Sequence, residues 1–257
     1  MKEEEKKIEP DNIAAIFLDE EKLERYVFTR DTLINQLQRV CPDINKSFDK
    51  VYADEFKRLS SDIGEILPII FIGLRKANES KRKLLMTSGD LLSNSAATII
   101  AAVQTLRCGF RMQSGILLRS VVEICATVVH LLVHPDILED FLADKVKSTK
   151  SISIADKQIP LFGMIWGVLS NRQIHINSLH ADKYPISEYK DKEELSATVT
   201  IGMLGVTTTI LAIVTELTFI NELEKPKYWE VLGEGKFKFI PPDDTNFTWT
   251  KELLKNK

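Results

Sequence analysis

Residues 111–135 read RMQSGILLRSVVEICATVVHLLVHP, a nearly apolar run that carries a few widely spaced ionisable side chains. Those that share a stripe are Arg119, Glu123, His130 and His134. Helical periodicity places all four within roughly 60° of one another on one face. A helix this apolar is typical of a protein interior, where charged groups need polar partners. The partner of this stripe therefore decides the function.

The composition of the 257-residue chain is that of an ordinary globular protein, with 44% apolar and 28% charged residues. This length permits one large helical domain or two small ones. A net charge of −3 argues against a broad electrostatic surface for nucleic acid, although it is compatible with a local one. The charged N-terminus, MKEEEKKIEP, lacks the apolar core of a secretory signal, so we expect a cytoplasmic protein.

The three cysteines, Cys41, Cys108 and Cys125, are far apart in the sequence. Cys108 and Cys125 fall within apolar helical stretches, which indicates buried thiols. Their spacing matches neither a disulfide framework nor a metal motif. We therefore expect no metal and no cofactor.

Glycine and proline are sparse, which favours helices along most of the chain. The two strongest helical patterns span residues 83–107 and 110–134, with Cys108-Gly109-Phe110 as a tight junction or a bend between them. Before them, the pattern predicts short helices over 11–39 that end at Cys41-Pro42-Asp43, a long helix capped by Ser47, and a break or kink at Pro68.

After Pro135 the sequence predicts an amphipathic helix, an exposed linker over 147–159, and a helix that starts at Pro160. It then predicts an exposed connection over 181–194, a long helix over 195–223, a β-hairpin of residues 228–232 and 236–240, and a short helix over 248–256. The predicted fold is all-α, a helical bundle with a small C-terminal β-hairpin. We divide it into an N-terminal helical region (1–82), a central bundle (83–225) and a hairpin with a tail (226–257).

The stretch 195–215 carries no charge and has the length of a membrane span. Its composition favours the central helix of a soluble bundle instead, because it is rich in threonine and contains Gly202 and Gly205. Its flanks carry Glu193, Glu194 and Glu216 rather than the basic and aromatic anchors of a span. We expect the two glycines to allow close helix–helix contact.

Arg119 and Glu123 are spaced i,i+4, so they can pair on one helix face, either as a structural ion pair or as part of a site. His130 and His134 have the same spacing, which can chelate zinc. The residues between the two histidines are apolar, so the acidic residue of a metalloprotease helix is missing. A cationic His134 is also favoured simply by its place at a helix C-terminus.

A second polar cluster lies in LSNRQIHINSLH, residues 169–180. Its hydrogen-bonding residues are Ser170, Asn171, Arg172, His175, Asn177, Ser178 and His180. This density indicates either a functional helix end or an exposed polar one. The sequence contains no nucleophile elbow, phosphate-binding glycine loop or dinucleotide fingerprint.

These two segments together resemble an uncharacterised bacterial all-helical family. The run LLRSVVEICATVVHLLVHPDILEDF is similar to that family's Arg-x-x-x-Glu helix, with Arg119 and Glu123 at the motif positions. The segment with Leu169, Ser170 and His175 is similar to the family's Leu-Ser-x-x-x-x-His motif. The likeness covers about residues 85–220.

That family is in turn similar to HEPN-type helical bundles, many of which are ribonucleases or toxins in bacterial conflict and anti-phage systems. Their ribonuclease motif is an arginine followed, after four to six residues, by a histidine. Position 170 is serine here, and Arg172 precedes His175 by two intervening residues and His180 by seven, so the motif is not matched. Arg119 would then supply the guanidinium from the neighbouring helix.

The resemblance implies a cytoplasmic, HEPN-like protein of bacterial defence or toxin type that acts on RNA or a nucleotide. Arg119 would bind phosphate, Glu123 would orient Arg119 or act as a base, and His175 would be the acid–base. The alternatives are a non-enzymatic helical module that binds a protein partner, and a membrane-acting effector that uses residues 195–215. We further expect a homodimer, because HEPN-type proteins commonly build their cleft between subunits.

Overall fold

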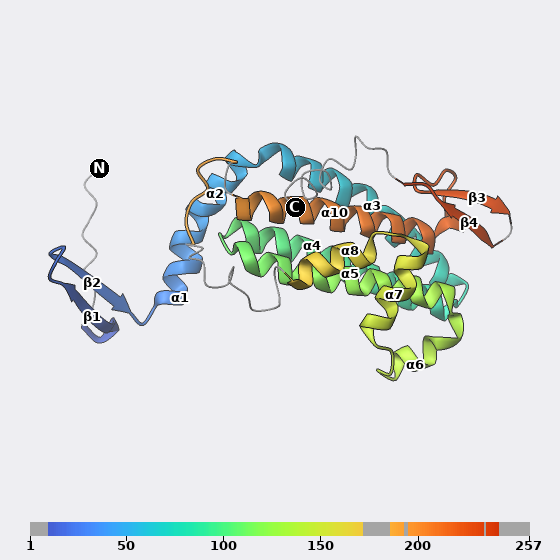
Figure 1. The fold of residues 1–257 in the computed structure, drawn as a ribbon, viewed down its shortest axis with the longest axis horizontal. Coiled ribbons are helices and arrows are strands. Elements are labelled where there is room, and N and C mark those ends of the chain that lie inside the picture. The colour runs from blue at the N-terminus through green and yellow to red at the C-terminus, as the bar shows by residue number, and fades with distance from the viewer. Residues whose placement is uncertain (1–9, 172–185, 193–194, 234, 242–257) are drawn as a thin grey trace.

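The computed structural model describes residues 10–171, 186–192, 195–233 and 235–241 and has the expected all-α architecture, a helical bundle with a small C-terminal hairpin (Figure 1). Its helices are α1 (Thr32–Ile34), α2 (Cys41–Val51), α3 (Ala53–Glu79), α4 (Lys83–Arg107), α5 (Arg111–Val133), α6 (Leu138–Leu142), α7 (Ser148–Gln158), α8 (Phe162–Leu169) and α10 (Leu195–Thr218). The strands are β1 (Ile13–Asp19), β2 (Glu24–Thr29), β3 (Trp229–Gly233) and β4 (Lys236–Phe239).

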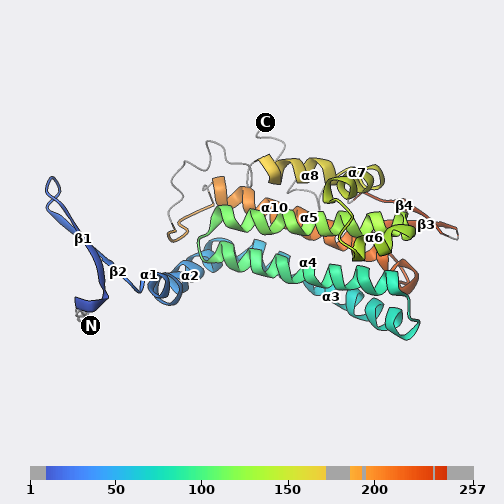
Figure 2. The ribbon, with the colours of Figure 1, turned by 90° about the horizontal axis from the view of Figure 1, so that it is seen from below.

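Four long helices form the core of the bundle: α3, α4, α5 and α10. Helix α10 contacts the other three, and α4 packs along α5 on one side and α3 on the other (Figures 1 and 2). The helices predicted over 83–107 and 110–134 are confirmed as α4 and α5. The expected division at residue 82 falls in the turn between α3 and α4, two helices that pack against each other.

Helix α10 is the most deeply buried helix of the bundle core. In its most apolar 18-residue window, 78% of the residues are buried inside the chain, and Gly202 and Gly205 are among them. Within the described residues, α5 and α10 are long and apolar enough to cross a membrane. The core helix of a soluble protein has the same length and composition, and α3, α4 and α5 cover α10 here.

Helices α7 and α8 pack on α5 (Figure 2). The expectation of an exposed linker over 147–159 is wrong, because residues 148–158 form α7 with Ser151, Ile152 and Ala155 buried. The apolar side chains of this segment are few, but they share one helix face that contacts α5. These two helices cover the α5 face that carries the candidate site.

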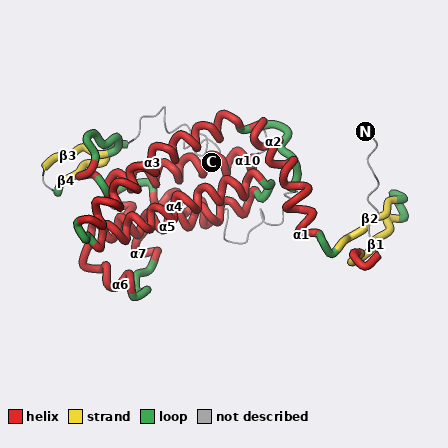
Figure 3. Tube along the Cα trace, turned by 180° about the vertical axis from the view of Figure 1, so that it is seen from behind, coloured by secondary structure: helices red, strands yellow, loops and turns green. Residues whose placement is uncertain are grey.

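Two hairpins lie at opposite ends of the molecule (Figures 1 and 3). The C-terminal one, β3 with β4, confirms the prediction. The expectation of helices over 11–39 is wrong for residues 13–29, which form the antiparallel pair β1–β2. The segment lacks a glycine or asparagine turn, and Leu23 adopts a positive φ of 56° in its place.

The chain is helical from residue 32 to residue 51, so the predicted break at Cys41-Pro42-Asp43 is wrong. A π-helical turn, Asn35–Val40, joins α1 to α2, and Pro42 lies in the first turn of α2 where a proline is tolerated. Ser47 lies inside α2 and caps nothing, and α3 continues through Pro68.

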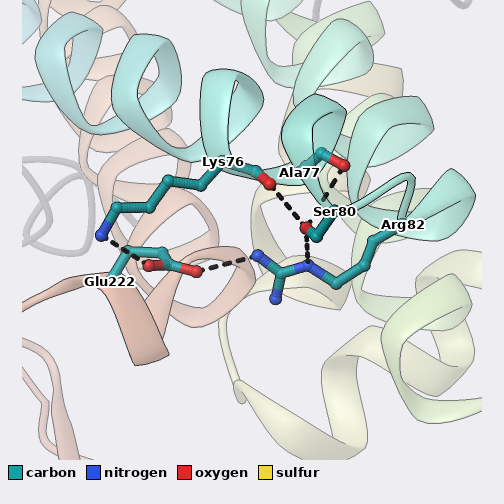
Figure 4. Close-up of polar contacts among 5 residues, drawn as sticks. All are labelled: Lys76, Ala77, Ser80, Arg82 and Glu222. Carbon is teal, nitrogen blue, oxygen red and sulfur yellow. Dashed lines mark hydrogen bonds and ion pairs between the residues drawn. The ribbon is translucent and has the colours of Figure 1, made fainter.

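A polar cluster fastens the turn between α3 and α4 to the end of α10 (Figure 4). Glu222 accepts hydrogen bonds from Lys76 Nζ at 2.8 Å and from Arg82 Nη2 at 2.9 Å. These bonds hold the pKa of Glu222 below its usual range, that from Lys76 being the strongest cause. Nearby, the Phe219 ring lies so close to Gly73 that an added Cβ would come within 2.2 Å of it.

The turn between α4 and α5 depends on Gly109, whose φ of 88° favours glycine. The buried Arg111 donates through Nη1 to the Gly109 carbonyl at 3.0 Å and stacks on Tyr189, with its Cζ 4.2 Å from the ring centroid. The expected exposed connection over 181–194 is therefore wrong at Tyr189, which is only 3% exposed and donates through its hydroxyl to the Leu106 carbonyl.

Candidate functional site

The N-terminal half of the α5 stripe forms a compact polar cluster with Trp166 of α8. Glu123 Oε1 accepts one hydrogen bond from Arg119 Nε at 3.0 Å and another from Trp166 Nε1 at 2.9 Å. The Arg119 Cζ lies 5.3 Å from the centroid of the Trp166 ring, within the range of a cation–π contact. One carboxylate oxygen thus orients both the guanidinium and the indole.

This arrangement leaves one edge of Arg119 available. Its Nη1 and Nη2 atoms make no hydrogen bond within the described part of the chain, and its side chain is 23% exposed. Glu123 is similarly placed, with its side chain 26% exposed and its Oε2 unused by described residues. A planar guanidinium held at Nε and open at both Nη atoms is a geometry suited to an oxyanion.

By contrast, the first residue of the C-terminal half of the stripe, His130, is closed off from solvent. His130 is 1% exposed, and its Nδ1 lies 3.0 Å from the Oγ of Ser151 on α7. Burial, followed by the charge of Lys150, lowers the pKa of His130 and favours the neutral ring. His134 is exposed, so the stripe predicted on one buried face leaves the interior at its last member.

The two histidines do not form a metal site with other described residues. Their ring centroids are 5.7 Å apart in an edge-to-face arrangement, and Ser151 occupies Nδ1 of His130. No group of three or more His, Cys, Asp or Glu side chains with the spacing of a metal site occurs in the described residues.

The second predicted cluster begins at the end of α8. Ser170 is 2% exposed, and its Oγ has no hydrogen-bond partner in the described structure, whereas Asn171 is exposed. Several predicted site residues lie outside the described residues: Arg172, His175, Asn177, Ser178 and His180. The convergence of His175 with Arg119 therefore stays a prediction.

A cavity of about 110 Å³ between α3, α10 and the start of β3 contains charged residues that the sequence did not single out. Glu216 is 7% exposed, and its Oε2 accepts the backbone N–H groups of Lys227 at 2.9 Å and Tyr228 at 2.8 Å. Burial raises the pKa of Glu216 and of Asp62, which also lines the cavity. Because Glu216 holds two backbone donors, its evident role is to anchor the C-terminal hairpin.

Of the three cysteines, Cys125 and Cys41 are buried, and Cys108 is only half-buried, contrary to expectation. Burial raises the pKa of the Cys125 thiol to about 12, so it stays protonated at neutral pH. The Cys41 thiol donates to the Cys108 carbonyl at 3.7 Å. Neither arrangement gives an activated nucleophile.

Comparison with protein-family models, curated proteins and solved structures gave no match for this chain. The sequence singled out Arg119 and Glu123, but it missed Trp166 as a member of the site. The sequence did hold one indication of its role, because the indole N–H of a tryptophan in an apolar helix needs a hydrogen-bond acceptor.

Proposed function

We propose that this protein binds a phosphate-bearing ligand, a nucleotide or RNA, at Arg119, Glu123 and Trp166, as a HEPN-like protein of bacterial defence or toxin type. The observation that carries the proposal is the open edge of Arg119. Its Nε is fixed by Glu123 and its plane by Trp166, while both Nη atoms have no partner in the described chain. Pre-orientation lowers the entropy lost when a phosphate binds in the bidentate mode.

In this role Glu123 is a positioning residue. Its Oε1 already accepts two hydrogen bonds, which supports orienting Arg119 rather than removing a proton from a substrate. Any proton transfer would fall to His175, which follows α8 by a few residues and lies outside the described segments.

The direct test is calorimetric titration of the full chain with a nucleoside monophosphate and with a short single-stranded RNA. Arg119→Gln removes both Nη donors and the positive charge and keeps a polar side chain, so the affinity should fall at least about 10-fold. The matched control is Arg75→Gln, an exposed arginine paired i,i+4 with Glu79. Equal affinity for wild type and Arg119→Gln, or equal losses in both variants, would overturn the proposal.

The enzymatic part is tested separately by expression in a bacterial host. We expect wild type to slow growth and His175→Ala to relieve the effect if His175 transfers the proton. Growth inhibition by both proteins would remove His175 from the mechanism while leaving phosphate binding by Arg119 to the titration.

A second candidate function, a non-enzymatic module that binds a protein partner, is favoured by the many exposed apolar side chains of residues 16–40. We do not propose a membrane-acting role, because α3, α4 and α5 cover α10. A cytoplasmic location is part of the proposal.

A further inference from the structure

The N-terminal segment of residues 16–40 concentrates exposed apolar surface. It holds 10 of the 23 large apolar side chains that are exposed in the described chain. They are Ile16, Phe17, Leu18, Leu23, Tyr26, Phe28, Leu33, Ile34, Leu37 and Val40. We refer to residues 13–40 as the arm. A monomeric globular protein rarely exposes an apolar area this continuous without a use for it.

Both faces of the β1–β2 hairpin are apolar. The register pairs Phe17 with Tyr26 and Ala15 with Phe28, so these aromatic side chains share one face, while Ile16 and Leu18 lie on the other. Phe17 is 58% exposed and Phe28 is 56% exposed. An isolated two-stranded hairpin is only marginally stable in water, and it gains stability by packing on another surface.

The arm cannot easily reach its own bundle. The continuous helix of residues 32–51 is anchored to the bundle by the buried Ile44 and Phe48, and its first residues carry the hairpin away from the other helices (Figures 1 and 2). Its uncovered portion, residues 32–40, spans about 13 Å at 1.5 Å per residue. A helix of this kind acts as a spacer that presents the hairpin to another molecule.

The bundle also offers a matching apolar groove. A groove of about 280 Å³ between α3 and α4 is lined by Phe56, Ile63, Ile100 and Val103, and Ile100 is 54% exposed. Along α3 the same face continues to Leu67 and Phe71, which fall within about 60° of Phe56 around the helix axis. Phe71 is 70% exposed. The groove and this stripe form an extended apolar strip on the surface.

We propose that the arm of one chain docks on the α3–α4 groove of a second copy, in a reciprocal two-fold exchange. With about half of each side chain uncovered, the 10 apolar residues of the arm expose on the order of 800 Å². One partner of a stable interface contributes about 800 Å². The chain thus carries both halves of a self-complementary interface, which is what a two-fold dimer requires. Gly202 and Gly205, buried within one chain, play no part in it.

Sedimentation velocity of the full chain at micromolar concentration tests the exchange. Wild type should sediment at twice the chain mass of 29.2 kDa. The double variant Phe17→Asp/Phe28→Asp and the groove variant Ile100→Asp should each weaken the dimer by about 100-fold or more, because each change acts at both contacts. The matched control is Val231→Asp, which alters a 56% exposed residue of the other hairpin and should stay dimeric.

Mixing the arm variant with the groove variant separates this exchange from pairing between two arms. In the mixed dimer one intact arm meets one intact groove, so a heterodimer should form where neither variant dimerises alone. A monomeric wild type at 100 µM, an arm variant that stays dimeric, or a groove variant that keeps the wild-type affinity would overturn the proposal. The bundle should keep its far-ultraviolet circular dichroism in every variant, since all substituted side chains are exposed.

Discussion

The two halves of the α5 stripe have the same residue spacing and opposite environments. Arg119 and Glu123 are about one-quarter exposed, and Trp166 holds them in an arrangement that leaves three polar atoms unused by the described chain. His130 is sealed against Ser151 with 1% exposure. The same i,i+4 spacing therefore accompanies an open polar edge at Arg119, which α8 covers in part, and a closed structural contact at His130, which α7 covers.

The difference teaches that the covering helix, rather than the residue pair, decides the role. A buried pair contributes to stability through hydrogen bonds that cannot be replaced by water, so breaking it is costly. A half-buried pair keeps water and ligands as alternative partners, so it adds little stability. Changes at His130 and Ser151 should therefore affect folding alone, whereas a change at Arg119 should affect ligand binding with little effect on folding.

The largest effect on stability should come from Trp166→Ala. This change removes a large side chain that packs against the core and leaves Glu123 with one donor fewer, so the free energy of unfolding should fall by about 3 kcal/mol. Trp166→Phe keeps an aromatic ring and removes the N–H with part of the indole, and should cost less, about 1–2 kcal/mol. Urea denaturation measures both losses, and equal losses would contradict this account, because they would show that the hydrogen bond rather than the packing of the ring holds α8.

Ser151→Ala should destabilise the chain by about 2 kcal/mol, because the buried His130 then has no partner. Its phosphate affinity should stay that of wild type. Thr149→Ala, an exposed change on the same helix, is the control. A reduced ligand affinity in Ser151→Ala would contradict the division of the stripe into a structural half and a binding half.

Glu123→Gln should cost about 1 kcal/mol of stability, since the amide oxygen can still accept both hydrogen bonds and only the charge is lost. We expect a small change in ligand affinity, because the loss of a nearby negative charge favours anion binding and offsets the weaker positioning of Arg119. Glu123→Leu removes the acceptor altogether, and its affinity should fall with that of Arg119→Gln. If Glu123→Leu binds as wild type, Glu123 does not position Arg119.

The smallest effect concerns pH. Because burial lowers the pKa of His130 below the ordinary value of 6.5, the unfolded chain takes up the proton first as pH falls. The contribution of neutral His130 to the free energy of unfolding is therefore complete above about pH 6.5 and is lost as the pH falls below that value. Thermal unfolding from pH 7.5 to 5 should show a shallower loss of stability in His130→Gln than in wild type, and the control Thr149→Ala should match wild type.

The long helices were predictable from the sequence because their apolar residues recur with helical spacing over more than 20 positions, as in α4 and α5. The hairpin of residues 13–29 was not predictable, because Leu23 adopts the positive φ of its turn and the segment has no glycine or asparagine that would indicate a turn. Helix α7 was missed because its buried face contains small and polar residues such as Ser151 and Ala155.

For the site, the Arg119–Glu123 pair follows from spacing within one helix. Its third member does not, because Trp166 lies 43 residues further along the chain than Glu123, and only the packing of α8 on α5 brings them together. The same holds for Ser151 and His130, which are 21 residues apart. Sequence periodicity defines a face, whereas the tertiary structure selects its partner.

The central claim is that the open edge of Arg119 binds a phosphate group. Nitrogen-15 NMR of arginine side chains, with the Arg119 signals assigned through Arg119→Gln, observes that edge during titration with a nucleoside monophosphate. We predict that the Arg119 Nη signals shift and slow in rotation, while those of the exposed Arg75 stay unchanged. Unchanged Arg119 signals at saturating ligand, or larger shifts at other arginines, would contradict the account.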